Sequence, residues 1–143
     1  MSPPPPPLER PFALRLDEPQ GPLPFIPRAV GAPRADGTGE VIWEYTVDPL
    51  HHNPYGTLHG GVVMALMDSA MGHVVGAAVH GQGRFNAAAQ MSVNFLAPVR
   101  AGTIRARARL VKLGKRLAVV EATAEDETGV AIATATAVHS LLP

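Results

Sequence analysis

Hydrophobic and polar positions change their spacing along the chain, and each change predicts an element. From Glu40 the sequence EVIWEYTVD alternates and predicts a strand. A nearly unbroken apolar run then predicts one long helix from about His59 to Val79. Alternation predicts further strands over about 87–97, 103–113, 116–125 and 129–141, joined by short connections typical of antiparallel neighbours. The faces expected to be shared are Val41/Trp43/Tyr45/Val47, Met91/Val93/Phe95, Ile104/Ala106/Ala108/Leu110 and Val130/Ile132/Thr134/Thr136/Val138.

This order of elements predicts an α+β protein. Because the helix is apolar almost all round, it must be covered on most sides, and a curved antiparallel sheet wrapped around it would do so. Eleven of the fifteen prolines fall in the first forty residues, which excludes a regular helix or a central strand there. We therefore predict a proline-rich tail and arm over 1–37 and one domain over 38–143. The polyproline stretch is either a solvated tail or a docking ligand for aromatic grooves.

Composition narrows the classes of partner. Twelve basic residues balance twelve acidic ones, which gives no argument for nucleic acid or an anionic membrane. There is no cysteine, so disulfides and thiolate chemistry are excluded. The N-terminus lacks the pattern of a secretory signal. The apolar run 61–79 is long enough for a membrane span, but Asp68 and His73 sit near its middle and favour a buried helix of a soluble, cytoplasmic protein.

Asp68 is the least expected residue of the predicted helix. A carboxylate in an apolar interior must find partners, change its pKa or be there for chemistry. The histidines suggest no metal site, since they lack the HExxH spacing and no thiolate can join them. We expect His59 to form hydrogen bonds that hold the loop before the helix, and His73 to be a core or interface residue. The other two histidines weighed as ligands are His51 and His52.

The run NPYGTLHGGVVMALMDSA resembles the signature of hotdog-fold acyl-CoA thioesterases, specifically the phenylacetate-degradation (PaaI-type) group. In that signature an asparagine, a glycine three residues on, a His-Gly-Gly triplet and an acidic residue have fixed spacings. The similarity continues through SVNFLAPVRAG and LGKRLAVVEATAEDETGVAIATATA and covers residues 40–141. The matching residues here are Asn53, Gly56, His59, Gly60, Gly61 and Asp68.

The resemblance implies a hotdog fold, in which five to six strands wrap one central helix, and hydrolysis of an acyl- or aryl-CoA thioester without a metal or other cofactor. Asp68 would act as general base or nucleophile, two routes that the sequence does not separate. The Gly60 N–H would polarise the thioester carbonyl. Some relatives carry a serine that assists the attacking water, at a position that corresponds to Ala88 here. The other candidates are Asn53 and His59 in the active site and Gly61 and Ser69 as substrate contacts.

The spacing of Gly60 and Asp68 has a geometric consequence. Eight residues of helix span about 12 Å, so the two groups of one chain cannot reach one thioester carbon. If both act, the site combines two chains, and we expect an obligate homodimer; the resemblance implies a homotetramer of two such dimers.

The basic residues have two interpretations. Arg105, Arg107 and Arg109 share one strand face, which is either a solvated face or a site for coenzyme A phosphates. Arg84, Lys115 and Arg116 are further candidates for those phosphates.

Two other functions stay open at this point. A non-catalytic acyl-CoA-binding hotdog module would not require Asp68. A hotdog dehydratase would pair a catalytic histidine with an acidic residue of the partner chain, and the sequence shows no matching histidine motif.

Overall fold

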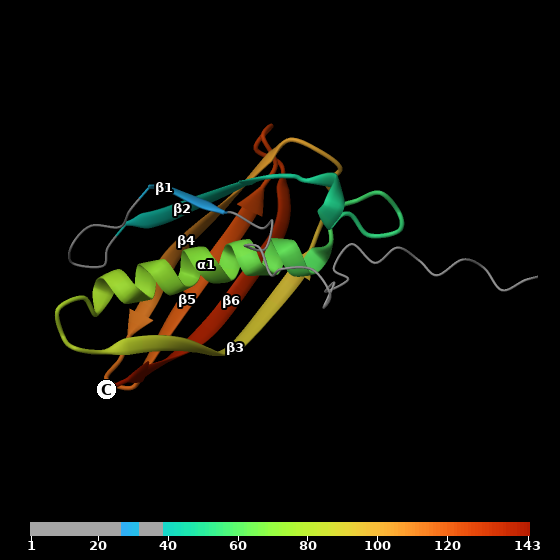
Figure 1. Ribbon diagram of the computed structural model, residues 1–143. Helices are drawn as coiled ribbons and strands as arrows, with labels where there is room; N and C mark the ends of the chain where they lie inside the picture. The colour runs from blue at the N-terminus through green and yellow to red at the C-terminus, as the bar shows by residue number, and fades with distance from the viewer. Residues whose placement is uncertain (1–26, 32–38) are drawn as a thin grey trace, which may run out of the picture.

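A six-stranded antiparallel sheet curves around one long helix in the computed structural model, which describes residues 27–31 and 39–143 (Figure 1). The strand order is β1-β2-β4-β5-β6-β3. This arrangement confirms the predicted α+β hotdog architecture. The elements are β1 (Arg28–Gly31), β2 (Glu40–Thr46), a 3-10 turn η1 (Pro49–His51), α1 (Gly60–Ala78), β3 (Phe85–Phe95), β4 (Thr103–Leu113), β5 (Leu117–Glu125) and β6 (Ala131–Leu142).

Part of the predicted proline-rich arm belongs to the sheet. β1 pairs antiparallel with the middle of β2, residues 42–44, and its register shifts between Ala29 and Gly31. Pro27 directly precedes this strand, a position that proline tolerates because the strand lies at a sheet edge. The polyproline tail lies outside the described residues.

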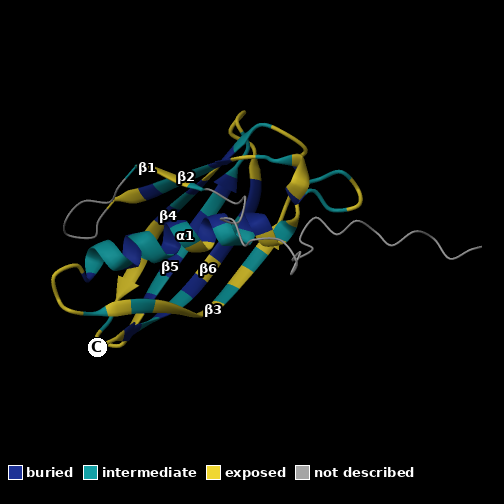
Figure 2. Ribbon diagram, viewed as in Figure 1, coloured by how far each residue is buried: buried dark blue, intermediate teal, exposed yellow. Residues whose placement is uncertain are grey.

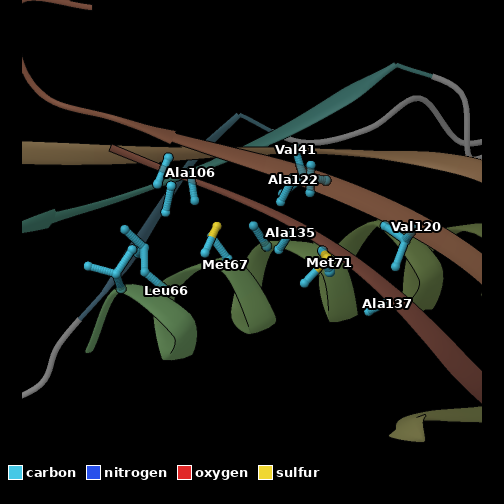
Figure 3. Packing of buried hydrophobic residues seen from close by; sticks show 14 of the residues in the cluster. Val41, Leu66, Met67, Met71, Ala106, Val120, Ala122, Ala135 and Ala137 are labelled. Carbon is cyan, nitrogen blue, oxygen red and sulfur yellow. The ribbon is translucent and has the colours of Figure 1, made fainter. Parts of the chain in front are cut away.

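The core lies between α1 and the concave face of the sheet (Figure 3). Side chains of α1 at helical spacing are buried there, and β4, β5 and β6 meet them largely with alanines, which let the helix lie close to the sheet. This helix is long and apolar enough to cross a membrane by length and composition alone, yet it packs along the sheet as a core element. Its buried residues are Val62, Val63, Leu66, Met67, Ala70, Met71, Val74 and Val75.

The expectation that the helix is covered on most sides was wrong for the single chain. The sheet covers only one side of α1, and the residues on the other side are exposed or half-buried (Figure 2). Asp68 lies on that open side and is exposed, so its carboxylate is not in the interior of the chain. Covering the other side of α1 would require a second layer.

The last strand presents mainly its small residues to the core, and most of its β-branched residues lie on the other face. Thr134, Thr136 and Val138 do share a face, but it points away from the helix. The buried positions are instead the small and polar ones between them, together with Ile132 near the start of the strand. The inner face of β6 therefore consists of Ala133, Ala135, Ala137, His139 and Leu141.

Candidate active site

The loop between β2 and α1 is held by backbone and side-chain hydrogen bonds. Asp48 caps η1 by accepting from Leu50 N–H at 2.9 Å, and the buried His51 ring is hydrogen-bonded to the hydroxyl of Tyr45. Leu58 N–H donates to the Val99 carbonyl at 2.7 Å, which ties the loop to the segment after β3. The start of α1 is therefore held by the loop after β2 and, through Leu58, by the segment after β3.

Asn53 organises the tip of this loop. Its Oδ1 accepts from the N–H groups of Tyr55 and Thr57 at 3.0 and 3.2 Å, and its Nδ2 donates to Thr57 Oγ1 at 2.8 Å. The asparagine lines the pocket described below, as the signature implied, but bonds to its own loop use its Oδ1 twice and one N–H of its Nδ2. In this structure Asn53 holds the loop that forms one wall of the pocket.

We expect Asn53→Ala to lower the free energy of unfolding by about 1–3 kcal/mol, since three hydrogen bonds at roughly 0.5–1.5 kcal/mol each are lost and water replaces part of them. Thr57→Val is the matched control, because it removes only the Nδ2 bond and should cost about a third as much. Urea unfolding at one fixed protein concentration measures both. Equal stability of Asn53→Ala and the wild type would contradict this role.

The first turn of α1 leaves one backbone donor unused. His59 caps the helix: its Nδ1 accepts from Gly61 N–H at 3.0 Å, while Val62 N–H donates to the His59 carbonyl at 2.9 Å. His59 thus has the hydrogen-bonding role predicted for it, and the Gly61 donor is already taken. Within the described part of the chain, the N–H of Gly60 has no hydrogen-bond partner. The positive end of the helix dipole lies at the same place.

A pocket of about 340 Å³ opens at this first turn. Gly60 contributes to its wall, and a Cβ at this position would lie 3.1 Å from the ring of Phe95, so glycine permits the close approach of that ring. The rest of the lining is almost wholly apolar and suits a hydrocarbon group. It consists of Asn53, Leu58, Val63, Phe95, Leu96, Ala97, Pro98, Val99 and Ile132.

Asp68 lies eight residues further along the helix and is not among the residues that line the pocket. The helical rise separates it from Gly60 by about 12 Å. Its carboxylate forms no hydrogen bond or ion pair within the described residues. One chain therefore does not bring the two central residues of the signature together.

A buried polar pair beside Asp68 was missed by sequence reasoning. His139 of β6 is 2% exposed, and its Nδ1 is 2.8 Å from Oδ1 of Asn86 on β3. Ala88, where some relatives were expected to carry a serine, is paired directly with His139 across the two strands. The histidine follows a row of alternating buried alanines on β6, a pattern that gives no local sign of a functional residue.

Two other polar residues of α1 are satisfied within the chain. Ser69 Oγ donates to the Ala65 carbonyl at 2.9 Å, so its hydroxyl is engaged in the helix. His73 Nδ1 accepts from Trp43 Nε1 at 3.1 Å, which gives this half-buried histidine a partner in the sheet. Across 27–31 and 39–143, no three His, Asp or Glu side chains gather closely enough to hold a metal ion.

The candidate phosphate-binding residues separate into two groups. On the outer face of the sheet, Arg105, Arg107 and Arg109 form ion pairs with Glu44, Glu125 and Glu121 at 3.3, 3.5 and 2.5 Å, which favours the solvated face over a phosphate site. Arg84 instead donates to the carbonyl of Lys115, next to Arg116 in the β4–β5 turn. This second group lies beyond the C-terminal end of α1, whereas the pocket lies at its N-terminal end (Figure 1).

One helix laid along a curved antiparallel sheet, with a pocket at its first turn, defines the hotdog class of proteins. The sequence profile of the thioesterase superfamily matches residues 55–133, from the loop before α1 into β6. The chain belongs to the thioesterase superfamily.

Individual relatives agree with this assignment. The proofreading thioesterase EntH of Klebsiella pneumoniae is 30% identical over 86 residues, which cover 60% of this chain and 62% of that protein. The chain spans about half of the length of the curated relatives it matches, from 46% to 62%.

Solved structures show the same fold. A phenylacetic acid degradation-related protein of Ralstonia eutropha superposes with a TM-score of 0.73 at 26% identity, over 84% of this chain and 92% of that one. A thioesterase of Haemophilus influenzae reaches 0.74 at 22% identity, over 81% and 78% of the two chains, a likeness that shows the fold alone.

Proposed function

We propose that the protein hydrolyses an acyl- or aryl-CoA thioester to the free acid and coenzyme A. The observation that carries this proposal is the N–H of Gly60, which has no partner among the described residues and lies in the wall of an apolar pocket. A thioester carbonyl oxygen placed against this N–H gains a hydrogen bond that strengthens as negative charge develops on it. The acyl or aryl group then lies among Leu58, Val63 and Phe95.

Asp68 supplies the proton-accepting or nucleophilic group from a second chain in this proposal. Its carboxylate is exposed on the uncovered side of α1, next to β3, which forms one edge of the sheet. A second copy that covers this side buries the carboxylate and brings it to the partner's first helical turn. The proposed enzyme is therefore a homodimer with two shared sites, and pairs of such dimers make a homotetramer.

The intact Asp68 favours an enzyme over a non-catalytic acyl-CoA-binding module, because binding alone gains nothing from a carboxylate beside a thioester. Arg84, Lys115 and Arg116 remain the proposed contacts for coenzyme A phosphates, since the arginines of the outer face are paired with glutamates.

A panel of thioesters tests the proposal directly. The protein is incubated with short-chain, long-chain and aromatic CoA esters, and free thiol is followed with a chromogenic disulfide. We expect turnover of at least one ester that depends on Asp68. Tight binding of the esters without thiol release would identify the binding module instead.

A further inference from the structure

His139 is a buried base whose hydrogen bond to Asn86 accounts for only one of its two ring nitrogens. It sits on the inner face of β6, and its neighbours across the strands are Ala88 of β3 and Ala118 of β5. The side chain of Asn86 donates through Nδ2 to the Gly72 carbonyl of α1 at 3.3 Å, which leaves its Oδ1 to accept. The 2.8 Å contact to His139 is therefore donated by the Nδ1–H of the imidazole, a tautomer that we infer from this network.

The other ring nitrogen has no hydrogen-bond partner among residues 27–31 and 39–143. With the proton on Nδ1, Nε2 carries a lone pair, and it is the buried side-chain atom without a hydrogen bond in the described part of the chain. A buried acceptor left unpaired destabilises the fold relative to a satisfied one. An apolar residue would avoid this cost, so the unpaired nitrogen requires an explanation.

Asn86 also shows on which side of the helix Asp68 lies. It contacts the Gly72 carbonyl, and a Cβ at Gly76 would lie 3.4 Å from its Nδ2. Residues 68, 72 and 76 are spaced by four and follow one side of the helix. Asp68 is therefore one turn from the Asn86 contact, on the side of α1 that faces β3.

The charges around His139 are consistent with a neutral imidazole. Burial lowers the pKa of His139, and the nearby Asp68 carboxylate partly opposes this by raising it. Asp68 is the titratable group of α1 that acts on the ring; β3 and β5 face it with Asn86, Ala88 and Ala118, which carry no charge. Nε2 is therefore free to accept a proton.

The backbone of β3 is irregular at the same place. The register between β3 and β6 shifts between Ala88 and Gln90, directly after the residue paired with His139. Bulges of this kind change the direction of side chains and are frequent next to active sites. The Ala88 methyl brings no hydroxyl to compete for Nε2.

We propose that His139, oriented by Asn86, is a second proton acceptor in the Asp68 site. This inference rests on the proposed hydrolysis. Asp68 and His139 Nε2 accept the two O–H groups of one water, whose oxygen bonds to the thioester carbon. The C–S bond breaks, the pair takes up the proton of the water, and that proton passes to the departing thiolate. One water and one thioester thus give one acid and one thiol.

His139→Asn tests the inference because the asparagine amide keeps a donor near the position of Nδ1 but removes Nε2. We expect kcat to fall about 10–100-fold, below the full range for general-base catalysis because Asp68 remains. KM should stay within about twofold. We expect the acid limb of the wild-type kcat/KM profile to show two ionisations and that of the variant to show one. Ala118→Gly is the control. This substitution next to the ring should lower the stability of the protein without changing the shape of the pH profile.

Two outcomes overturn the inference without touching the proposed function. The first is a folded His139→Asn variant with the wild-type kcat and pH profile, while Asp68→Asn is inactive. The second outcome can be measured even if His139→Asn does not fold. ¹⁵N NMR of the wild-type protein follows protonation of the His139 ring, and a midpoint of the ring that matches neither ionisation of the acid limb would overturn the inference. The expected result is a match, with a lower midpoint in Asp68→Asn because a neighbouring negative charge is lost.

Discussion

Asp68→Asn lowers kcat for the preferred CoA ester by about 10²–10⁴-fold, the range for loss of general-base help. The amide keeps the shape of the side chain but neither accepts a proton nor attacks a carbonyl. Because the Asp68 carboxylate has no hydrogen-bond or ion-pair partner within the described residues and the amide has nearly the same size, the fold and KM should change little. Steady-state kinetics, with a thermal melt of each protein, measure these effects.

Glu121→Gln is the matched control for Asp68→Asn. It makes the same carboxylate-to-amide change on the outer face of the sheet, where Glu121 pairs with Arg109. A single surface ion pair contributes about 0–1 kcal/mol, so this variant should keep full activity. If Asp68→Asn retains more than half of the wild-type kcat, its assignment as the central catalytic group is wrong.

Mixing two inactive variants restores activity if the sites are shared between chains. Gly60→Pro removes the N–H, and the position suits proline: Gly60 is the first helical residue, and His59 before it has the extended ψ of 130° that proline requires. A dimer of one Gly60→Pro chain and one Asp68→Asn chain has one site with Asp68 from the first and Gly60 from the second. With random exchange about half of the dimers are mixed, so activity returns to roughly a quarter of wild type.

Gly60→Ala is the control for the steric part of the proline substitution. It places the same Cβ against the Phe95 ring, at 3.1 Å before adjustment, but keeps the N–H. Phe95 is 55% exposed, so its ring has room to move. We expect the alanine variant to keep most of its activity and the proline variant to lose about 10²–10³-fold. A mixture of folded, exchanging parents that stays inactive would show that Gly60 and Asp68 do not meet across an interface.

The periodicity of the sequence predicted most of the fold because each element has one dominant pattern. The strand expected at 103–113 has those bounds, and the helix differs by one residue at each end. β1 was not predicted, since prolines obscure a four-residue edge strand that depends on β2 for its hydrogen bonds.

The site was less predictable because it depends on distances between elements. The signature made Gly60 and Asp68 candidates, but only the structure showed that the N–H of Gly60 has no partner among the described residues and that Asp68 is exposed in one chain. His139 lies 71 positions after Asp68, and no local pattern predicts that the β3–β6 register places it beside Asn86.

The two edges of the sheet differ in a way that limits how copies of the chain can join. One edge is the four-residue β1 with its irregular register, and the other is β3, eleven residues long, with no strand beside it among the described residues. A sheet with two long open edges can add strands without end, as fibrils do. Here, antiparallel pairing of two β3 strands would use the long edge of both chains and leave only the short ones, so growth through sheet edges stops at two copies.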